Sequence, residues 1–173
     1  MGITAHSFKQ RFTALLERFE FDQVEVLLNV LTQVESSADE ILYRCGEHSD
    51  VLHLVWEGRV SLSMSVGAKD ITLGAIGPGQ FIGALSVIDP GPAPVTFKVI
   101  EQSVLLRLDH ASLNTLREEY PEVGSLLLRT LSHDLATWLR TYEEYLMRRT
   151  QSGSVEEFVQ LGMHLLGLKE LPE

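Results

Sequence analysis

The sequence predicts a mainly β, α+β fold in which an antiparallel sandwich or a jelly roll is flanked by helices. Short apolar segments recur through the middle of the chain at intervals of roughly eight to twelve residues, which is the strand spacing of such folds. Turn-forming Gly, Pro and Asp residues separate these segments. Towards both ends of the chain, apolar residues repeat every three or four positions, a spacing that is typical of helices.

The composition is that of a globular protein with an acidic surface. The chain has 173 residues, of which 45% are hydrophobic, and a formal net charge of −10. This size fits one domain with an extension, and the charge disfavours DNA and anionic membranes, so we expect neither as a partner. The single cysteine, Cys45, fits a reducing compartment, and no apolar run is long enough to span a membrane. Both features favour a cytoplasmic location.

Residues 1–32 are expected to form N-terminal helices that pack on the β domain. Phe8, Phe12 and Leu15 follow a helical spacing, and the pattern resumes at Val24. Asp22 is a plausible cap between two helices, because its carboxylate can accept bonds from free backbone N–H groups.

Residues 33–120 are expected to hold the β domain. Hydrophobic residues alternate with polar ones from Arg59 to Val66, so one face of this segment should be buried and the other exposed to water. Asp109 is predicted to cap a helix that follows the last strand. Six strands are predicted, at residues 41–43, 51–56, 59–66, 71–76, 95–100 and 104–108. Turns are predicted at residues 45–47, 57–59, 67–70 and 77–79.

A long helix is predicted at residues 121–150, with Pro121 at its first position. Its apolar stripe can pack on its own domain, on a second copy of the chain, or on both, and we expect a homodimer. Residues 151–173 are predicted to form a terminal helix and tail, which can dock on the domain or on another protein. The stripe follows a heptad spacing through Leu128, Leu131, Leu135, Trp138, Tyr142 and Tyr145.

The stretch from Gly77 to Thr96 organises the rest of the chain. It opens with a Gly-Pro-Gly turn, continues with an apolar segment long enough for a helical turn or two, and ends in a loop that contains Pro90, Pro92 and Pro94. A glycine before a short helix leaves backbone N–H groups free to meet an anion. The architecture is that of a phosphate cradle, but the charged side chains that such a cradle normally carries are absent from it.

Several segments resemble the cyclic-nucleotide-binding domain family. Residues 44–50 resemble its Gly-Asp/Glu-x-x-Asp turn, residues 58–60 match its Gly-Arg-Val, and residues 77–83 look like its approach to the phosphate-binding cassette. The resemblance covers about residues 20–150. It implies a double-stranded β-helix, or jelly roll, of the catabolite activator and protein kinase A regulatory-subunit type. It also implies that the long helix pairs two subunits and roofs the ligand.

The cassette departs from the family pattern at its two charged positions. The family's Glu, which takes the ribose hydroxyl, falls at Ala84, and its Arg, which takes the cyclic phosphate, falls at Ala93. Lys98, the nearest base, lies on the following strand. Losing two hydrogen bonds to charged groups costs about 3–6 kcal/mol, or roughly a hundredfold to ten-thousandfold in affinity. We therefore expect no binding of cyclic AMP or cyclic GMP in the usual way.

These observations predict a non-catalytic, bacterial-type regulatory module that acts through dimerisation and an unidentified protein partner. The histidines are scattered, His53 fits a core position, and no nucleophile motif is present, so we expect no enzyme, metal or cofactor. Residues 151–173 are too few for the winged helix-turn-helix of the activator relatives, so the chain is not expected to bind DNA by itself. The alternative is a sensor of a non-standard small ligand or nucleotide. Its site would comprise Gly83, Ala84, Leu85, Ser86, Ala93, Pro94, Val95 and Thr130.

Overall fold

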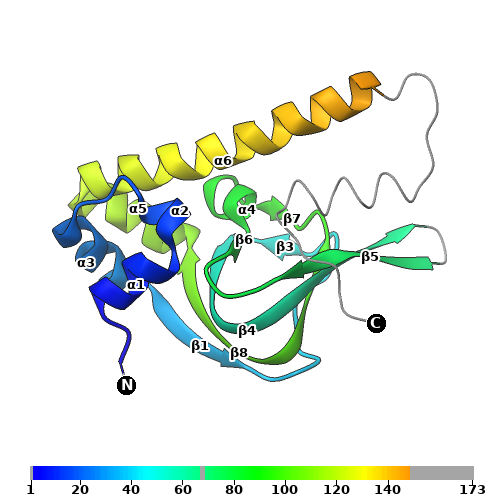
Figure 1. The fold of residues 1–173 in the computed structure, drawn as a ribbon, viewed down its shortest axis with the longest axis horizontal. Helices are drawn as coiled ribbons and strands as arrows, with labels where there is room; N and C mark the ends of the chain where they lie inside the picture. Colours follow the sequence, from blue (N-terminus) through cyan, green and yellow to red (C-terminus); the bar gives the residue numbers. More distant parts are fainter. Residues whose placement is uncertain (1, 67–68, 149–173) are drawn as a thin grey trace.

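The structure is a computed structural model that describes residues 2–66 and 69–148. A curved β-roll forms one half of it, a group of helices forms the other, and the long helix α6 runs along the top of both (Figure 1). In chain order the elements are α1 (Ala5–Arg11), α2 (Thr13–Leu16), α3 (Phe21–Val30), β1 (Thr32–Ser36), β2 (Ile41–Tyr43), β3 (His48–Ser49), β4 (Val51–Val66), β5 (Lys69–Ile76), β6 (Phe81–Ile82), α4 (Ala84–Ile88), β7 (Gly91–Pro92), β8 (Thr96–Asp109), α5 (His110–Glu119) and α6 (Pro121–Arg148).

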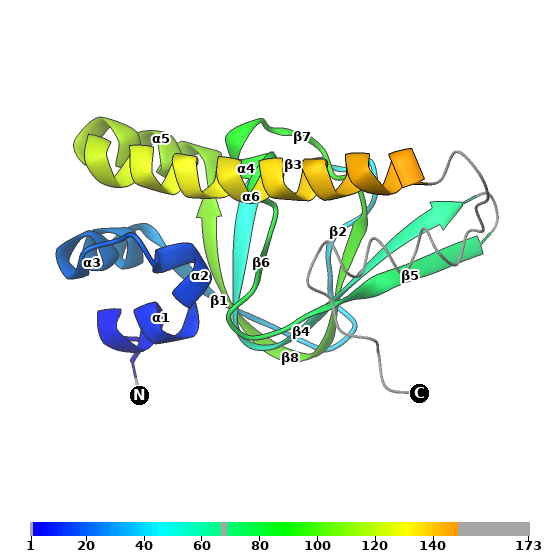
Figure 2. The same ribbon diagram turned by 45° about the horizontal axis from the view of Figure 1, so that its top comes forward.

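Strands β4 and β8 are the centre of the sheet. The strand order is β1-β8-β4-β5, β2 also pairs with β8, β6 also pairs with β4, and all these pairs are antiparallel. β4 has 16 residues and β8 has 14, and both bend so that the sheet curls into a roll (Figure 2). A separate two-stranded ribbon joins β3 to β7. The predicted mainly β jelly roll with flanking helices is confirmed.

The bend of β4 lies at Gly58, inside the strand. Gly58 has a φ of +86°, and the register between β4 and β8 shifts repeatedly from Val55 to Val60. A Cβ atom at Gly58 would lie 2.1 Å from Ser103 Oγ and 2.7 Å from the Gln102 carbonyl oxygen. Only glycine therefore allows the two strands to approach this closely while β4 bulges.

This bulge overturns part of the predicted strand pattern. Residues 51–56 and 59–66 belong to one continuous strand, so the turn predicted at residues 57–59 is wrong. Residues 95–100 and 104–108 are likewise joined in β8. The sequence analysis also missed β1, β3, β6 and β7. Three of these have two residues each and are too short to show any period.

The N-terminal segment contains three helices, and Asp22 does not cap any of them. Glu20 is the N-cap of α3, in an extended conformation, and its N–H donates to Gln23 Oε1 at 3.0 Å. Asp22 lies within the first turn of α3, so its predicted role as the cap is wrong. A carboxylate in the first turn still interacts favourably with the positive end of the helix dipole.

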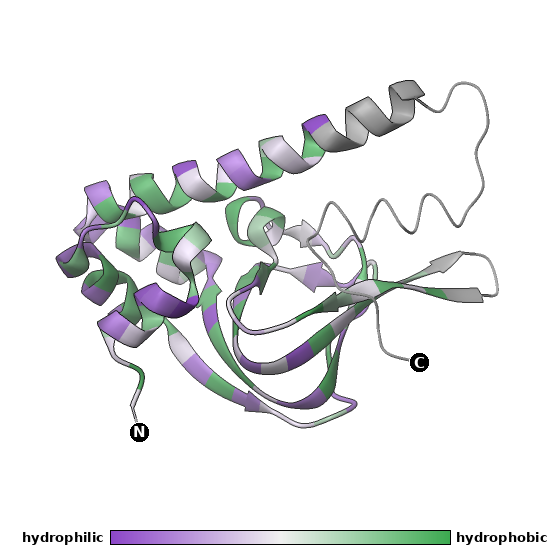
Figure 3. Ribbon diagram, viewed as in Figure 1, coloured by the Kyte–Doolittle hydropathy of each residue, from purple (hydrophilic) through white to green (hydrophobic). Residues whose placement is uncertain are grey.

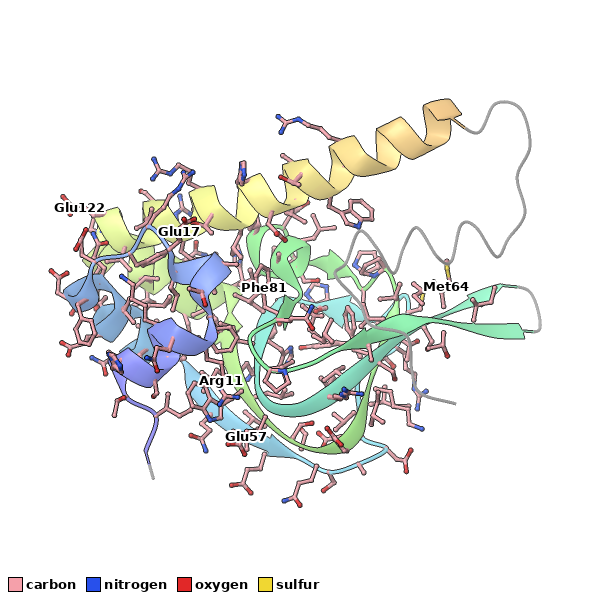
Figure 4. All side chains as sticks on the ribbon, in the orientation of Figure 1. Arg11, Glu17, Glu57, Met64, Phe81 and Glu122 are labelled. Atoms are coloured by element: carbon pink, nitrogen blue, oxygen red, sulfur yellow. The ribbon has the colours of Figure 1, made fainter. Side chains whose placement is uncertain are left out.

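Arg11 fixes α1 to the β-roll. Its guanidinium lies 4.4 Å from the centre of the Trp56 ring, and its Nη1 donates to the Trp56 carbonyl oxygen at 2.7 Å. Figure 4 labels Arg11 where α1 meets the strands. A Cβ at Gly79 would lie 2.6 Å from the Arg11 carbonyl oxygen, so the Gly-Pro-Gly turn also packs tightly against the end of this helix.

Two hydrophobic cores lie on opposite faces of the wall formed by β4 and β8. Side chains alternate between the two faces along each strand, and because both faces are covered, each strand contributes hydrophobic residues to both cores. Figure 3 shows hydrophobic residues in the helices and in the strands. The helix-side core includes Phe8, Phe12, Leu16, Leu52, Leu54, Leu106, Leu108 and Leu131. The roll core includes Val55, Val60, Leu62, Ile82, Phe97, Val99 and Leu105.

The C-terminal helices follow the prediction as far as the structure describes them. Asp109 caps α5, because its Oδ1 accepts the Ser112 N–H at 2.8 Å. α6 begins at Pro121, as predicted, and runs to Arg148, the last described residue, so the predicted end of the helix at residue 150 lies outside the described residues. The terminal helix and tail predicted at residues 151–173 lie outside the described residues. No helix in the described part of the chain is long and apolar enough to cross a membrane.

Candidate functional site

The cassette begins where β6 leads into α4. Gly83, at the start of α4, has a left-handed φ of +87°, and a Cβ there would lie 2.0 Å from the Val51 carbonyl oxygen. Phe81, labelled in Figure 4, marks the strand that leads into this turn. α4 then supplies the short helix that the sequence predicts after a glycine, held by the Val87 N–H donating to the Gly83 carbonyl at 3.0 Å.

The loop after α4 is tied to the turn before β4. The Ala93 N–H donates to the Glu47 carbonyl at 2.7 Å, and the Gly46 N–H donates to the Ala93 carbonyl at 2.8 Å. The Cys45 N–H donates to Thr96 Oγ1 at 3.0 Å, and its Sγ contacts the Pro94 carbonyl at 3.3 Å. These bonds fix the backbone of the proline-rich loop even though its prolines donate none.

The predicted ligand-contacting residues do gather at the cassette, but they differ in exposure. Ala84, Ser86 and Ala93 are buried, and Ala93 is only 2% exposed. Leu85 is 51% exposed on the outer side of α4. The remaining members are exposed or half-buried: Gly83, Pro94, Val95 and Thr130.

Thr130 does not offer its hydroxyl to the cassette. Its Oγ1 donates to the Leu126 carbonyl at 3.0 Å, within α6. α4 nevertheless contacts both α5 and α6, so α6 covers the cassette as the resemblance implies (Figure 2). His110 adds a polar link, because its Nδ1 lies 2.8 Å from the Val87 carbonyl oxygen at the end of α4.

Lys98, the base nearest to the cassette in the sequence, is paired outside it. Its Nζ lies 2.6 Å from Asp39 Oδ1, and this hydrogen bond and the lysine charge lower the pKa of the Asp39 carboxyl. The cassette itself, residues 81–95, contains no Lys or Arg. Among the described residues, no group of His, Cys, Asp and Glu side chains could hold a metal ion.

The match to a known family agrees with this geometry. The sequence profile of the cyclic nucleotide-binding domain matches residues 33–120. This chain belongs to the cyclic nucleotide-binding domain family. Its fold is that of a cyclic nucleotide-binding domain from Methylobacillus flagellatus, with a TM-score of 0.74 and 20% identity over 90% of each chain.

Two further proteins that this chain resembles are longer than the matched segment. The catabolite activator protein of Thermus thermophilus superimposes with a TM-score of 0.70 and 25% identity, over 77% of this chain and 61% of that one. Lysophospholipase nte1 of Aspergillus fumigatus is 30% identical over 154 residues, which are 85% of this chain and 10% of the relative. The chain thus spans about a tenth of the length of the curated lysophospholipases that it matches. Its described part contains no DNA-binding domain.

The sequence analysis did not predict that His53, Tyr43 and Arg107 lie close together at the β-roll. His53 is 7% exposed, as expected of a core histidine, and its ring centre lies 5.9 Å from that of Tyr43. Burial, with a smaller contribution from the Arg107 charge, lowers the pKa of His53 to about 4. The alternation of residues 51–55 and 105–109 would have placed His53 and Arg107 on the same face, but their pairing is not visible in one sequence.

The structure corrects one member of the predicted dimer surface. Leu131 is fully buried in its own domain and is not accessible to a second copy. Leu128 and Leu135 are half-buried against the same core. Trp138 and Leu139 are 38% and 50% exposed. The side chains of Tyr142 and Tyr145 lie outside the described part of the structure.

Proposed function

We propose that this chain is a non-catalytic regulatory and protein-interaction module that does not bind cyclic AMP or cyclic GMP in the usual way. One observation carries the proposal: the two charged positions of the family cassette are occupied by Ala84 and Ala93, both buried. A cyclic phosphate placed there would lose its water without gaining a counter-charge, which is strongly unfavourable. The module would act in the cytoplasm through self-association and a protein partner, and the exposed free thiol of Cys45 fits that reducing compartment.

The small fraction of each lysophospholipase that this chain matches supports a role as a module. The matched segment is about a tenth of those proteins, so a domain of this type accounts for only a small part of each longer chain. The charge balance of this chain, with 24 acidic residues against 14 basic ones, disfavours DNA as the partner. A protein surface is therefore the partner that fits best.

Calorimetric titration of cyclic AMP and cyclic GMP tests the cassette directly. We expect no binding tighter than about millimolar, because two charge-assisted hydrogen bonds are missing. A double variant, Ala84→Glu with Ala93→Arg, should bind about a hundredfold to ten-thousandfold more tightly if the family frame is otherwise intact. Micromolar binding by the parent chain would contradict the proposal. A folded double variant that gains no affinity would show that the loop geometry, rather than the missing charges, prevents binding.

The exposed apolar side chain of Leu139, next to Trp138 of the helical stripe, supports self-association through α6. Leu139 is half-exposed on this helix, and an apolar residue there is stabilised when a second copy covers it. We expect sedimentation velocity to show a dimer at tens of micromolar, and Leu139→Glu to weaken it by about tenfold or more. The control is Ile100→Glu, which places the same charge on an exposed apolar position of β8. A monomeric parent chain, or equal effects of the two variants, would contradict this part of the proposal.

The second candidate function, a sensor of a non-standard ligand, is favoured by one specific observation. The roll-core face beside the cassette carries the buried side chain of His53 together with the half-buried side chains of Tyr43 and Arg107, rather than apolar side chains alone. A buried imidazole is costly unless it has a partner, so a ligand that hydrogen-bonds to His53 would stabilise this face.

A further inference from the structure

The apolar stripe of α6 continues beyond the part of the helix that its own domain covers. Leu131, Leu135 and Leu139 follow one another at intervals of four residues, so they lie on one side of the helix. Leu131 is 0% exposed, Leu135 is half-buried against the helix-side core, and Leu139 is 50% exposed. The described elements that bury this side of α6 therefore stop covering it between Leu135 and Leu139.

The arrangement of the helices explains why the cover stops there. α3, α4 and α5 contact α6, and they lie along its first half. The far half of α6 extends past all three of them in both views (Figures 1 and 2). An exposed leucine on this half is stabilised when another apolar face removes it from water.

The sequence that follows α6 contains an apolar face of its own. Phe158, Leu161 and Leu165 follow a helical spacing of three and four residues, and Ser154 with Glu157 forms a capping-box pattern before them. A helix of about 15 residues is only marginally stable alone in water, and the glycines within this one weaken it further. Such a helix is stabilised when its apolar face packs on another surface.

The connection between the two segments suits a helical hairpin. Residues 149–153 separate Arg148, the last described residue of α6, from Ser154, and antiparallel helices are joined by loops of about two to five residues. At about 1.5 Å per residue, Leu139 lies about 14 Å back from Arg148, and a helix over residues 154–168 is about 22 Å long. A returning helix would therefore pass Leu139, with Leu161 and Leu165 alongside residues 137–141.

We propose that residues 154–168 fold back on α6 as an antiparallel helix that covers Leu139 and competes there with a second copy of the chain. The short connection favours this occupant over a separate protein, because it holds the segment near α6 at an effective concentration of about millimolar. The inference rests on the self-association through α6 proposed above, since it states what must leave Leu139 before a second copy can bind. A protein that binds the apolar face of residues 154–168 instead would favour the dimer by linkage.

Cross-linking within the full chain tests where the segment lies. In a Cys45→Ser background, a short bismaleimide should join Leu139→Cys to Leu161→Cys in a cross-linked monomer, at concentrations well below those at which the dimer is expected. The control pairs Ile100→Cys with Leu161→Cys, because Ile100 is 38% exposed on β8 rather than on α6. Equal cross-linking of the two pairs, or no cross-linked monomer with the Leu139 pair, would overturn the proposed position.

Leu165→Glu in the otherwise unchanged chain tests the competition. The new charge should release the segment, and sedimentation velocity should then show self-association about tenfold tighter, the change that corresponds to burial of about one leucine side chain. Gln160→Glu adds the same charge on the opposite side of the predicted helix and should leave self-association unchanged.

The outcomes of this second test separate the two proposals. Unchanged self-association in Leu165→Glu would overturn the competition, and weaker self-association would show that the segment belongs to the dimer interface instead. The absence of a dimer in the parent chain and both variants would overturn the self-association proposed above together with the competition. The cross-linking result decides independently whether the segment covers Leu139.

Discussion

Replacing Gly83 by alanine is expected to destabilise the domain by about 3 kcal/mol or more, with loss of the folded state in mild denaturant. The left-handed φ of +87° alone is unfavourable for alanine. The larger cost is steric, because the new Cβ would lie 2.0 Å from the Val51 carbonyl oxygen and 3.1 Å from its carbon. Backbone atoms cannot rotate away, so α4 and β4 would have to separate.

Gly46→Ala is the matched control for this experiment. Gly46 has nearly the same φ, +85°, but no atom lies within 4 Å of a Cβ built there. Its replacement should therefore cost only about 1–2 kcal/mol, the penalty of the left-handed conformation. Urea denaturation followed by circular dichroism measures both values. Equal losses for Gly46 and Gly83 would show that the close approach of α4 to β4 does not stabilise the domain.

Acidification from pH 7 to pH 4 is expected to remove about 3 kcal/mol of stability through His53 alone. In the unfolded chain His53 takes up a proton near its ordinary pKa of 6.5, whereas in the folded chain burial delays this until the pKa of about 4. The unfolded state therefore binds more protons between these values. The stabilising contribution is complete above pH 6.5 and is lost as the pH falls towards 4.

The variant His53→Gln isolates this contribution, because glutamine does not titrate. The difference in unfolding free energy between parent and variant should shrink as the pH falls from 7 to 4, as measured by urea denaturation at each pH. Asp39 and Asp109 have pKa values below their usual range, so their contributions are lost at more acidic pH and are present in both proteins. A constant difference across this range would show that folding does not lower the pKa of His53.

Much of the fold could be predicted because its signals are local. The helical spacing after residue 121, the Pro121 start and the Asp109 cap each depend on a few neighbouring residues, and the structure confirms the helix, its start and the cap. The bulge at Gly58 was misread as a turn, because a glycine with a positive φ occurs in both, and only the distant partner Ser103 decides between them.

At the candidate site, the sequence allowed only one prediction, that the two charged residues of the cassette are absent. The alanines at the two charged cassette positions can be read directly from the sequence, but the pairing of His53 with Arg107 depends on the register of two strands that are far apart in the chain. The apolar stripe of α6 is likewise only partly informative in the sequence. Its period shows that Leu131 is covered, but not whether its own domain or a second chain covers it.

Because α6 is long, a small tilt at its anchored end becomes a larger displacement at its far end. The helix has 28 residues and is about 42 Å long, and its first turns are anchored by Val123, Leu127 and Leu131. α4 contacts α6, and His110 joins α4 to the neighbouring α5. A tilt of about 10° at the anchored end would move the far end by about 7 Å, as on a lever. A small displacement of α4 against α6 would thus become a larger displacement at the far end of the helix.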